Sequence, residues 1–308
     1  RMIDSVLLIA FGGPTRPEEV GPFLDNVARG RRIPRERMEE VAHHYEEIGG
    51  RSPFNELTQK QADGLRAALE REGIALPVFV GMRNWHPYVL EALREMVEKG
   101  CRRALGIILS SLQSEASWER YQGNVAEARA QIGSEAPEVV YTPPWFDHRR
   151  FIEAQADRTR VALEEVPTAR RRDTPLVFTA HSVPLTMAHG SPYVEQLTLA
   201  SRLVAAELNH GRWAIAYQSR SGSPAEPWLE PDIGAVVRDL ARNEAQDIAI
   251  APIGFVSDHV EVLYDLDVEA RGIAEAAGVR LHRARAVNDH PAFIAMLVDL
   301  VKSGLEAG

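Results

Sequence analysis

Cysteine and lysine are both scarce in this chain of 308 residues, which holds one cysteine, Cys101, and only three lysines. A disulfide within the chain needs two cysteines, and an iron–sulfur cluster of the 2Fe–2S type needs four ligands, so we expect neither. Cysteine used so sparingly fits a reducing compartment. Nearly all positive charge is therefore carried by arginine, which suits bidentate pairing with carboxylates where it faces a pocket.

An excess of basic charge and long apolar runs are also missing. The formal net charge is −9 and the isoelectric point is near 5.6, whereas nucleic-acid-binding domains present a basic face. No apolar stretch approaches the roughly 18 residues that a membrane-spanning helix needs. The first residues, RMIDSVLLIAFGG, enter a strand-like run without the regions of a signal peptide. We therefore predict a cytoplasmic protein that binds no nucleic acid and has no transmembrane segment.

Short apolar runs alternate along the chain with longer amphipathic helical patterns. Helices are predicted at Leu57 to Glu72, Pro87 to Glu98 and Tyr193 to Glu207. The apolar runs are SVLLIAFGG, PVFVGMRN, RALGIILSS and EVVYTPPW in the first half, and PLVFTAHSVP, WAIAYQSRSG, DIAIAPIGF and VRLHRARA in the second. This alternation predicts an α/β protein with two similar domains, each a four-stranded parallel sheet flanked by helices.

The first domain is predicted to contain residues 1–117 and 288–308, because a last helix at Pro291 to Leu305 is expected to pack back on it. The second domain is predicted to contain residues 118–287. Most strands end in polar or glycine-rich segments, and ligands of parallel sheets bind beyond the carboxyl ends of the strands. We therefore expect a central cleft between the domains.

Four acids, Asp258, Glu261, Asp265 and Glu269, follow a predicted buried strand. If this segment is helical, they lie within an arc of about 80° on one face. Asp258 is also consistent with a helix cap, and Glu261 with the second residue of a capping box. The row of four acids is also consistent with a solvated surface. Like charges four residues apart repel, so we favour a path for a cation or a proton relay.

Three further segments allow both a structural and a functional interpretation. His181, in TAHSVP, is either a hydrogen-bonded residue at a strand end or a proton acceptor and transition-metal ligand. Trp228, in QSRSGSPAEPWLEP, lies either in a surface loop or in an aromatic wall. The basic run ARGRRIPRER, Arg29 to Arg37, is either a solvated helix entry or a site that collects carboxylates at a cleft mouth. A hydrolase elbow and a phosphate-binding loop are both missing.

Three segments, AHSVP, QSRSG…PWLEP and GFVSDHVEVLYDLD, occur in an order and at separations that resemble the ferrochelatases. FGGPTRPEEVGPFLDNVARGR, YEEIGGRSPFNELTQKQ and VGMRNWHP extend this resemblance over essentially the whole chain. The resemblance implies two Rossmann-like lobes that hold a porphyrin between them. It also implies insertion of ferrous iron into the porphyrin in haem biosynthesis, with removal of two pyrrole protons.

The resemblance also implies roles for individual residues. His181 matches the cleft histidine that acts as metal ligand or proton acceptor, and Glu261 matches the glutamate opposite it. Asp265 and Glu269 match an acidic metal track that leads outward, while Asp258 and His259 support the site. The positions implied to face the porphyrin or its propionates are Phe11, Arg29, Tyr45, Ser52, Arg83, Tyr121, Trp228 and Phe255. Phe11 stands where many soluble relatives carry a tyrosine, so that contact with the metal is absent.

The region from Gly21 to Leu57 is strongly polar, whereas mitochondrial relatives have an apolar lip there. This favours coproporphyrin III as the substrate over protoporphyrin IX. A cobalt or nickel chelatase would share the two-lobed architecture, and a non-catalytic porphyrin or haem carrier would share the cleft. We expect a monomer that contacts neighbouring haem-pathway enzymes transiently and holds no cofactor tightly, with Fe(II) as a substrate and no 2Fe–2S cluster.

Overall fold

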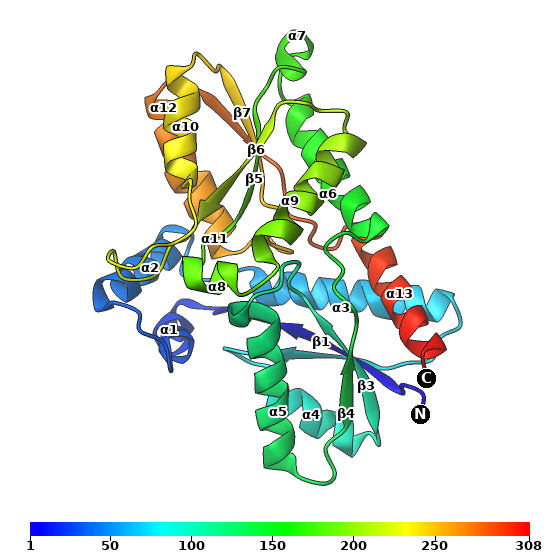
Figure 1. Ribbon diagram of the computed structural model, residues 1–308. Coiled ribbons are helices and arrows are strands. Elements are labelled where there is room, and N and C mark those ends of the chain that lie inside the picture. The colour runs from blue at the N-terminus through cyan, green and yellow to red at the C-terminus, as the bar shows by residue number, and fades with distance from the viewer.

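The computed structural model describes all 308 residues and contains two lobes, each built on a four-stranded parallel sheet (Figure 1). The first lobe has the strand order β2-β1-β3-β4, and the second has the order β6-β5-β7-β8. The strands are β1 (Ser5–Ala10), β2 (Val78–Met82), β3 (Arg103–Ile108), β4 (Glu138–Tyr141), β5 (Leu176–His181), β6 (Trp213–Gln218), β7 (Asp247–Ala251) and β8 (Arg280–Arg283). The predicted fold class is confirmed.

Helices surround both sheets, and every residue of the central strands β1 and β7 is buried, as parallel sheets covered on both faces require. The α-helices are α1 (Val20–Ala28), α2 (Arg35–Glu47), α3 (Phe54–Arg71), α4 (Val89–Glu98), α5 (Arg120–Ile132), α6 (Arg149–Glu164), α7 (Thr168–Arg171), α8 (Leu185–His189), α9 (Tyr193–Glu207), α10 (Ile233–Arg242), α11 (Val260–Leu263), α12 (Arg271–Ala276) and α13 (Pro291–Glu306). A short 3₁₀ helix spans Pro17–Glu19, and π-helical segments span Glu115–Glu119 and Asp265–Ala270. None of these helices is both long and apolar enough to cross a membrane.

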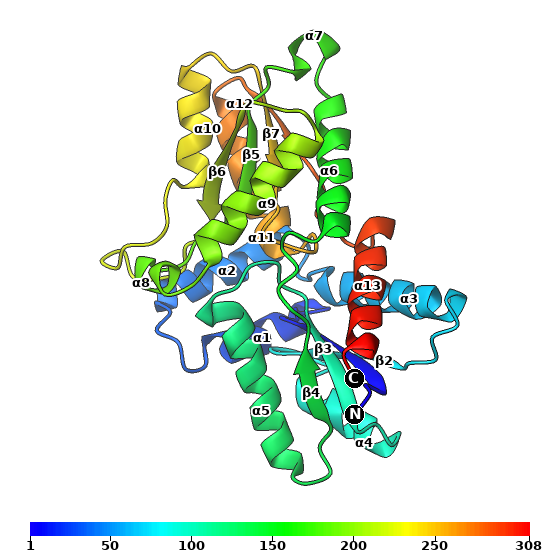
Figure 2. The same cartoon turned by 45° about the vertical axis from the view of Figure 1, so that its right-hand side comes forward.

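The change from one sheet to the other comes later in the chain than the boundary predicted at residues 117 and 118. Strand β4 pairs with β3, with Tyr141 beside Gly106, so that α5 and β4 complete the first sheet. The polar segment near residue 115 lies beyond the carboxyl end of β3, where the π-helical turn Glu115–Glu119 leads into α5, and it does not connect the two sheets. Helix α13 packs against both α3 and α6, and the two chain termini lie close together (Figure 2).

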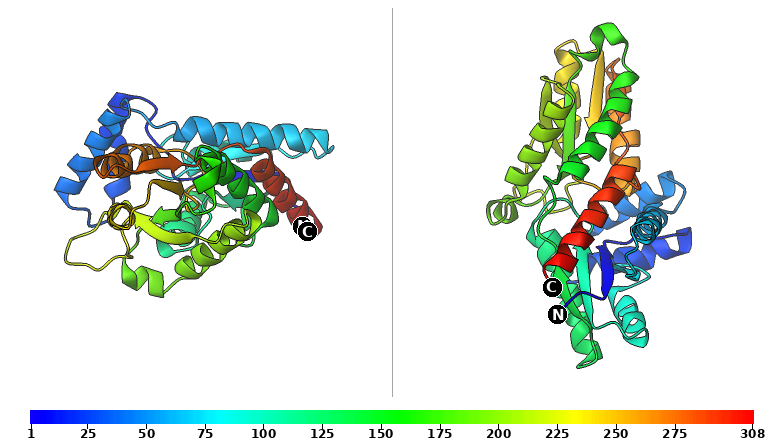
Figure 3. Two further views of the ribbon diagram at one scale, coloured as in Figure 1. Left: turned by 90° about the horizontal axis from the view of Figure 1, so that it is seen from above. Right: turned by 90° about the vertical axis from the view of Figure 1, so that its right-hand side faces the viewer.

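The second lobe lies above the first in the right-hand view of Figure 3, and residues just beyond strand ends of both sheets line one cavity. Buried amides hold this arrangement. Gln61 on α3 is fully buried and its Nε2 donates to the carbonyls of Val256 and Asn288, at 3.1 and 2.9 Å. Gln196 on α9 accepts from the backbone N–H of Gln113 at 2.9 Å and donates from Nε2 to the Gln113 side chain at 2.6 Å. Side chains of one lobe thus bond to loops of the other.

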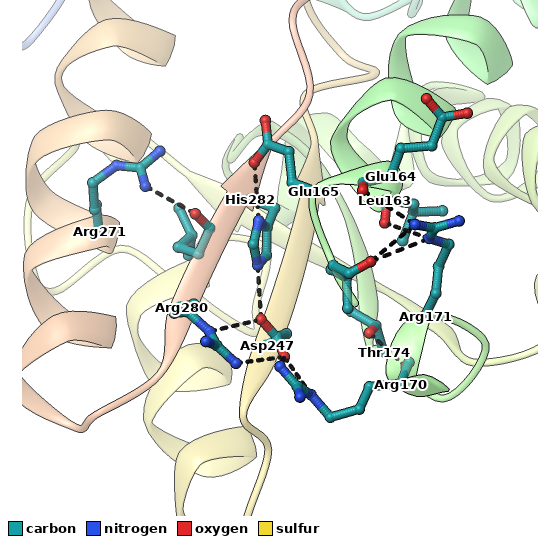
Figure 4. A network of polar contacts seen from close by, with 12 residues as sticks. Leu163, Glu164, Glu165, Arg170, Arg171, Thr174, Asp247, Arg271, Arg280 and His282 are labelled. Carbon is teal, nitrogen blue, oxygen red and sulfur yellow. Dashed lines mark hydrogen bonds and ion pairs between the residues drawn. The ribbon is translucent and has the colours of Figure 1, made fainter. Parts of the chain in front are cut away.

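An ionic network locks the opposite, amino-terminal end of the second sheet. Asp247, at the start of β7, is 3% exposed and accepts hydrogen bonds from Arg280 and Arg170 (Figure 4). His282 lies between two carboxylates, with Nε2 2.9 Å from Asp247 and Nδ1 2.9 Å from Glu165. This network ties β7 and β8 to the helical segment between α6 and β5, far from the cleft.

Gly254 allows a close approach that positions the cleft loop after β7. A Cβ atom at this residue would lie 2.5 Å from the Cβ and 2.7 Å from the Cα of Ala180, which directly precedes His181. Gly254→Ala should therefore lower the free energy of unfolding by about 1–3 kcal/mol. The midpoint of urea unfolding measures this change.

Gly272→Ala is the matched control, because Gly272 is in α12 and a Cβ there meets no atom within 4 Å. This variant should gain about 0.5–1 kcal/mol, since alanine loses less backbone entropy than glycine in a helix. Equal shifts of the two variants in the same direction would contradict the packing argument.

Candidate functional site

A cavity of about 250 Å³ lies between the carboxyl ends of the two sheets. Its wall includes residues just beyond four strand ends: Phe11 after β1, Leu109 after β3, Ser182 after β5 and Phe255 after β7. In both sheets these are the strands where the chain order reverses, which is where open α/β sheets bind ligands. A larger hollow of about 840 Å³ runs along the outer edge of β2, but it contains none of the predicted site residues. The cleft cavity is therefore the candidate site.

Aromatic rings form much of the cavity wall. Helices α1 and α2 close the side that the sheets leave open, and the ring of Phe23 lies 6.2 Å from Phe11 and 6.0 Å from Tyr45. The aromatic lining residues are Phe11, Phe23, Tyr45, Phe54, Tyr121, Tyr193, Trp228 and Phe255. All five predicted porphyrin-facing aromatic residues are among them. A wall of this kind suits a flat apolar ligand.

His181 and Glu261 lie in contact with each other in this cavity. His181 ends β5, Glu261 is in α11, and their Nε2 and Oε1 atoms are 3.5 Å apart. Both side chains come from the second lobe, and they face each other. The Nδ1 atom of His181 donates to the carbonyl of Ser182 at 2.5 Å. In the neutral ring the lone pair is therefore on Nε2, which is free to accept a proton.

Glu261 and Asp265, the two acids that line the cavity, have opposite pKa shifts. Burial alone would raise the pKa of Glu261, but the charge of protonated His181 and the hydrogen bond from His259 lower it to about 2. The Nε2 atom of His259 is 3.2 Å from Glu261 Oε2. Burial raises the pKa of Asp265 to about 7, although the Ser219 hydroxyl donates to its carboxylate. At neutral pH a charged carboxylate thus lies next to one that gains and loses a proton.

Three of the four predicted acids form a row from the cavity to the outer surface. Glu261 and Asp265 line the cavity, whereas Glu269 is exposed and lines an outer hollow with Arg238. The helix changes to π geometry from Asp265 to Ala270, where each turn contains more residues than in an α-helix. Burial is the main cause of the raised pKa of Asp265, and the charges of Glu261 and Glu269 add to it, so the three acids lie near one another.

Asp258 is outside this row, and the predicted capping box is absent. The N-cap of α11 is His259, which makes no side-chain capping hydrogen bond. Asp258 instead accepts hydrogen bonds from Arg283 at 2.8 Å, from the backbone N–H of Ala286 at 3.0 Å and from Asn288 at 2.8 Å. It therefore anchors the loop after β8, because the backbone there bonds to its carboxylate.

Three predicted polar contacts lie outside the cavity wall. Arg29 is exposed and donates to Asn26 at 3.2 Å. Ser52 is buried and accepts from the backbone N–H of Phe54 at 3.2 Å. Arg83 is half-buried just after β2. Their contacts with a porphyrin stay predictions.

A cluster of arginines near the cavity was only partly predicted. Burial and the charge of Arg120 lower the pKa of both Arg31 and Arg83, that of Arg83 to about 10. None of the three guanidinium groups forms an ion pair within 4 Å, although ion pairs are common elsewhere in the chain. Arg31 lines the cavity. The basic run ARGRRIPRER was the signal for Arg31, but no sequence feature pointed to Arg120.

His44 was not predicted as a site residue. It is 5% exposed, comes from α2 and lines the cavity next to Asp265. Burial lowers the pKa of His44 to about 4. In the sequence it is one of two adjacent histidines within a polar helix, and only the fold distinguishes the buried one.

Comparison with known proteins identifies the relatives of this chain. The ferrochelatase family model matches residues 4–305. The coproporphyrin III ferrochelatase of Mycolicibacterium smegmatis is 44% identical over 301 residues, which cover 97% of this chain and 88% of that protein. A ferrochelatase of Rhodopirellula baltica is 41% identical, with 98% and 86% covered. The cobalt complex of the sirohydrochlorin chelatase SirB from Bacillus subtilis subspecies spizizenii has the same fold, with a TM-score of 0.60 at 10% identity over 99% of this chain and 96% of SirB.

The raised pKa of Asp265 predicts a pH dependence of stability. The native state keeps a proton on Asp265 that the unfolded chain has released, so the free energy of unfolding should fall as pH rises from about 4 to about 7. The slope of this contribution is about 1.4 kcal/mol per pH unit at most. Asp265→Asn should remove it, as measured by urea unfolding between pH about 5 and about 8.

Asp239→Asn is the control, because Asp239 is an exposed aspartate on α10, away from the cavity. It should keep the wild-type slope. If Asp265→Asn also kept that slope, the raised pKa of Asp265 would be excluded.

Proposed function

The chain belongs to the ferrochelatase family, and from this we infer that it inserts ferrous iron into coproporphyrin III in haem synthesis. The family match and the relatives that are 41–44% identical over nearly the full length support this inference. One observation in the structure carries this inference. An imidazole nitrogen free to accept a proton lies 3.5 Å from a carboxylate in an aromatic cavity.

Metallation exchanges two pyrrole N–H protons for one divalent ion. In the proposed mechanism, Nε2 of His181 accepts a pyrrole proton, and the resulting imidazolium is stabilised by Glu261, whose carboxylate is already charged. The carboxylate of Glu261 offers oxygen ligands to the arriving iron, whereas Nε2 of His181 can bind the ion only before it takes up the proton. His259 orients Glu261 through the contact between its Nε2 and Glu261 Oε2.

The row from Glu261 through Asp265 to Glu269 provides a route between the cavity and the surface. Asp265 has a pKa of about 7 and therefore exchanges protons readily at neutral pH. We propose that it passes the released protons outward. Carboxylates also hold Fe(II) by hard oxygen ligands, so the same row serves the ion on its way in.

The arginine cluster supports a substrate with several carboxylates. Burial and the charge of Arg120 lower the pKa of Arg31 and Arg83, and none of the three guanidinium groups forms an ion pair within 4 Å. Such a cluster is costly unless a ligand provides the counter-charges. Coproporphyrin III carries more propionate groups than protoporphyrin IX and is therefore the better match.

The cavity requires a change of shape before it can hold a macrocycle. Its volume of about 250 Å³ is below the range of about 300–1,000 Å³ that encloses most small-molecule ligands. We propose that α1 and α2 move outward, because their buried apolar residues belong to a small cluster of four, formed by Phe23, Leu24, Tyr45 and Val260 of α11. The sheets are fixed to each other by buried amides.

In this proposal iron is a substrate, and no tightly bound cofactor or 2Fe–2S cluster takes part. A monomer, a cytoplasmic location and transient contact with neighbouring enzymes of the pathway stay predictions.

Glu261→Gln and His181→Ala should each lower kcat for iron insertion by at least about 100-fold, because each removes a group that accepts or stabilises the pyrrole proton. Binding of coproporphyrin III should persist, since the aromatic wall and the arginines remain. Anaerobic absorbance assays with Fe(II) measure the rate, and fluorescence quenching measures porphyrin binding.

Glu275→Gln makes the same chemical change on the exposed face of α12 and should leave the rate unchanged. Tight porphyrin binding without metallation by the wild type would identify a carrier. A Glu261→Gln enzyme as fast as the wild type would exclude the proposed chemistry.

Arg31→Gln should raise KM for coproporphyrin III by about tenfold, because it removes a charge-assisted hydrogen bond to a propionate. The effect on protoporphyrin IX should be smaller, since it offers fewer carboxylates. The control is Arg35→Gln, because Arg35 is exposed, pairs with Glu39 and does not line the cavity. Equal losses for both porphyrins would show that Arg31 does not select between them.

A further inference from the structure

The chain crosses between the lobes twice, and each crossing ends at a histidine. The first crossing follows β4 and ends at His148, the N-cap of α6, and the second follows β8 and ends at His290, the N-cap of α13. In both, Nδ1 accepts the backbone N–H two residues further on, at 3.0 Å. Serine, asparagine and aspartate are the usual residues at this position. A histidine cap differs from them because it has a second ring nitrogen.

The second nitrogen of each histidine faces a carboxylate on the other helix. Nε2 of His290 is 2.6 Å from Asp157 Oδ2 on α6, and Nε2 of His148 is 3.6 Å from Asp299 Oδ2 on α13. The first is a hydrogen bond and the second a longer contact. Because Nδ1 of His290 accepts, Nε2 carries the hydrogen and donates it to Asp157. This hydrogen bond is the main cause of the lowered pKa of Asp157.

Helices α6 and α13 belong to different lobes. Helix α6 packs against α9 and β7 of the second lobe, whereas α13 packs against α3 of the first (Figure 2). A Cβ atom at Gly304 in α13 would lie 3.0 Å from Leu105 on β3, so α13 also lies directly on the first sheet. The contact between α6 and α13 is therefore a contact between the lobes.

The centre of this contact is aromatic. Trp145, Phe151 and Phe293 are at most 1% exposed, and the ring of Phe293 lies 5.9 Å from Trp145 and 6.5 Å from Phe151. Neither these rings nor the two histidine–aspartate pairs line the cavity. Apolar contact is non-directional, whereas a hydrogen bond requires a defined distance and angle. The pair of His290 and Asp157 therefore restrains the angle at which the two helices meet.

The proposed chemistry is divided between the same two lobes. The arginines that would bind the carboxylates are in the first lobe, and His181, which would accept the proton, is in the second. A porphyrin held by its carboxylates on one lobe thus presents its nitrogens to the other. Proton transfer requires about 2.6–3.2 Å between donor and acceptor atoms. The angle between the lobes determines whether a pyrrole nitrogen comes this close to Nε2 of His181.

We propose that His290 and Asp157, supported by His148 and Asp299, form a clasp that sets the angle between the lobes. The clasp residues are positioning residues, because they act through the lobes and do not touch the substrate. They hold the bound porphyrin within reach of His181. This role rests on the proposed function, whereas the clasp itself rests on the geometry of α6 and α13.

His290→Asn separates the clasp from the helix cap, because asparagine is a favourable N-cap but too short to reach Asp157. His290→Asn and Asp157→Ala should each lower kcat for iron insertion into coproporphyrin III by about tenfold, since small misplacements of reacting groups are costly. KM for the porphyrin should change by less than about twofold, because the arginines remain together in one lobe. The double variant should be no slower than either single variant, since both changes remove one contact.

Glu153→Ala is the matched control. Glu153 is an exposed acid on the same helix as Asp157, and it pairs at 2.9 Å with Arg150 of that helix. This variant should keep the wild-type kcat. An unchanged kcat in His290→Asn and Asp157→Ala would overturn the proposal, and so would a rise in KM that explains the whole loss of kcat/KM. Thermal unfolding shows that each variant is folded.

Spin labels measure the clasp without turnover. Glu70→Cys on α3 and Glu275→Cys on α12, in a Cys101→Ala background, place one label on each lobe. Double electron–electron resonance then gives the distribution of distances between the lobes without porphyrin or iron. His290→Asn and Asp157→Ala should broaden this distribution, and Glu153→Ala should not. Equal widths in all variants would overturn the clasp, whereas broadening in a protein without chelatase activity would count against the proposed function alone.

Discussion

Eight parallel strands direct their carboxyl ends into one cleft, and the whole site depends on the two sheets keeping this arrangement. One contact that supports this arrangement is a buried amide, because Gln61 bonds to the carbonyls of Val256 and Asn288 in the other lobe. These carbonyls belong to the loops that follow β7 and β8. Without the amide the Asn288 carbonyl would be buried and unpaired, which is more costly than the loss of a typical hydrogen bond. The Val256 carbonyl would still accept from the backbone N–H of Asn288 at 3.1 Å. The loop after β7 also carries Phe255 and leads directly to Glu261.

Buried charges in the cleft lack the ion-pair partners that balance a buried charge elsewhere in the molecule. At the far end of the second sheet, the buried carboxylate of Asp247 is balanced by two arginines and a histidine. In the cleft, Asp265 is buried with a pKa raised to about 7, and the arginine cluster has no acidic partner. Unbalanced charge of this kind costs stability in the empty protein. It is the expected property of a site that receives a cation and a polyanion.

Helices α1 and α2 give the cavity its third wall and carry residues that the sheets alone would not supply. Tyr45 and His44 are neighbours on α2, yet Tyr45 packs on Phe23 while His44 stacks on Tyr264. The helix therefore contacts its own lobe and the opposite lobe within two residues. This places α2 at the edge of the cavity, between the two lobes. The polar character of the segment follows from this position at a solvent-facing entrance.

Local patterns in the sequence determined the strands, most helix positions and the composition of the site, because apolar runs and amphipathic periods are properties of neighbouring residues. Helix α9 was predicted with its observed bounds, and His181, Glu261 and Asp265 were all identified. Only the tertiary structure decided which groups meet. It placed His181 beside Glu261, removed Asp258 from the acidic row, assigned β4 to the first sheet, and joined His44 and Arg120 to the site. Such pairings join residues far apart in the chain, and they depend on packing between elements that no local pattern records.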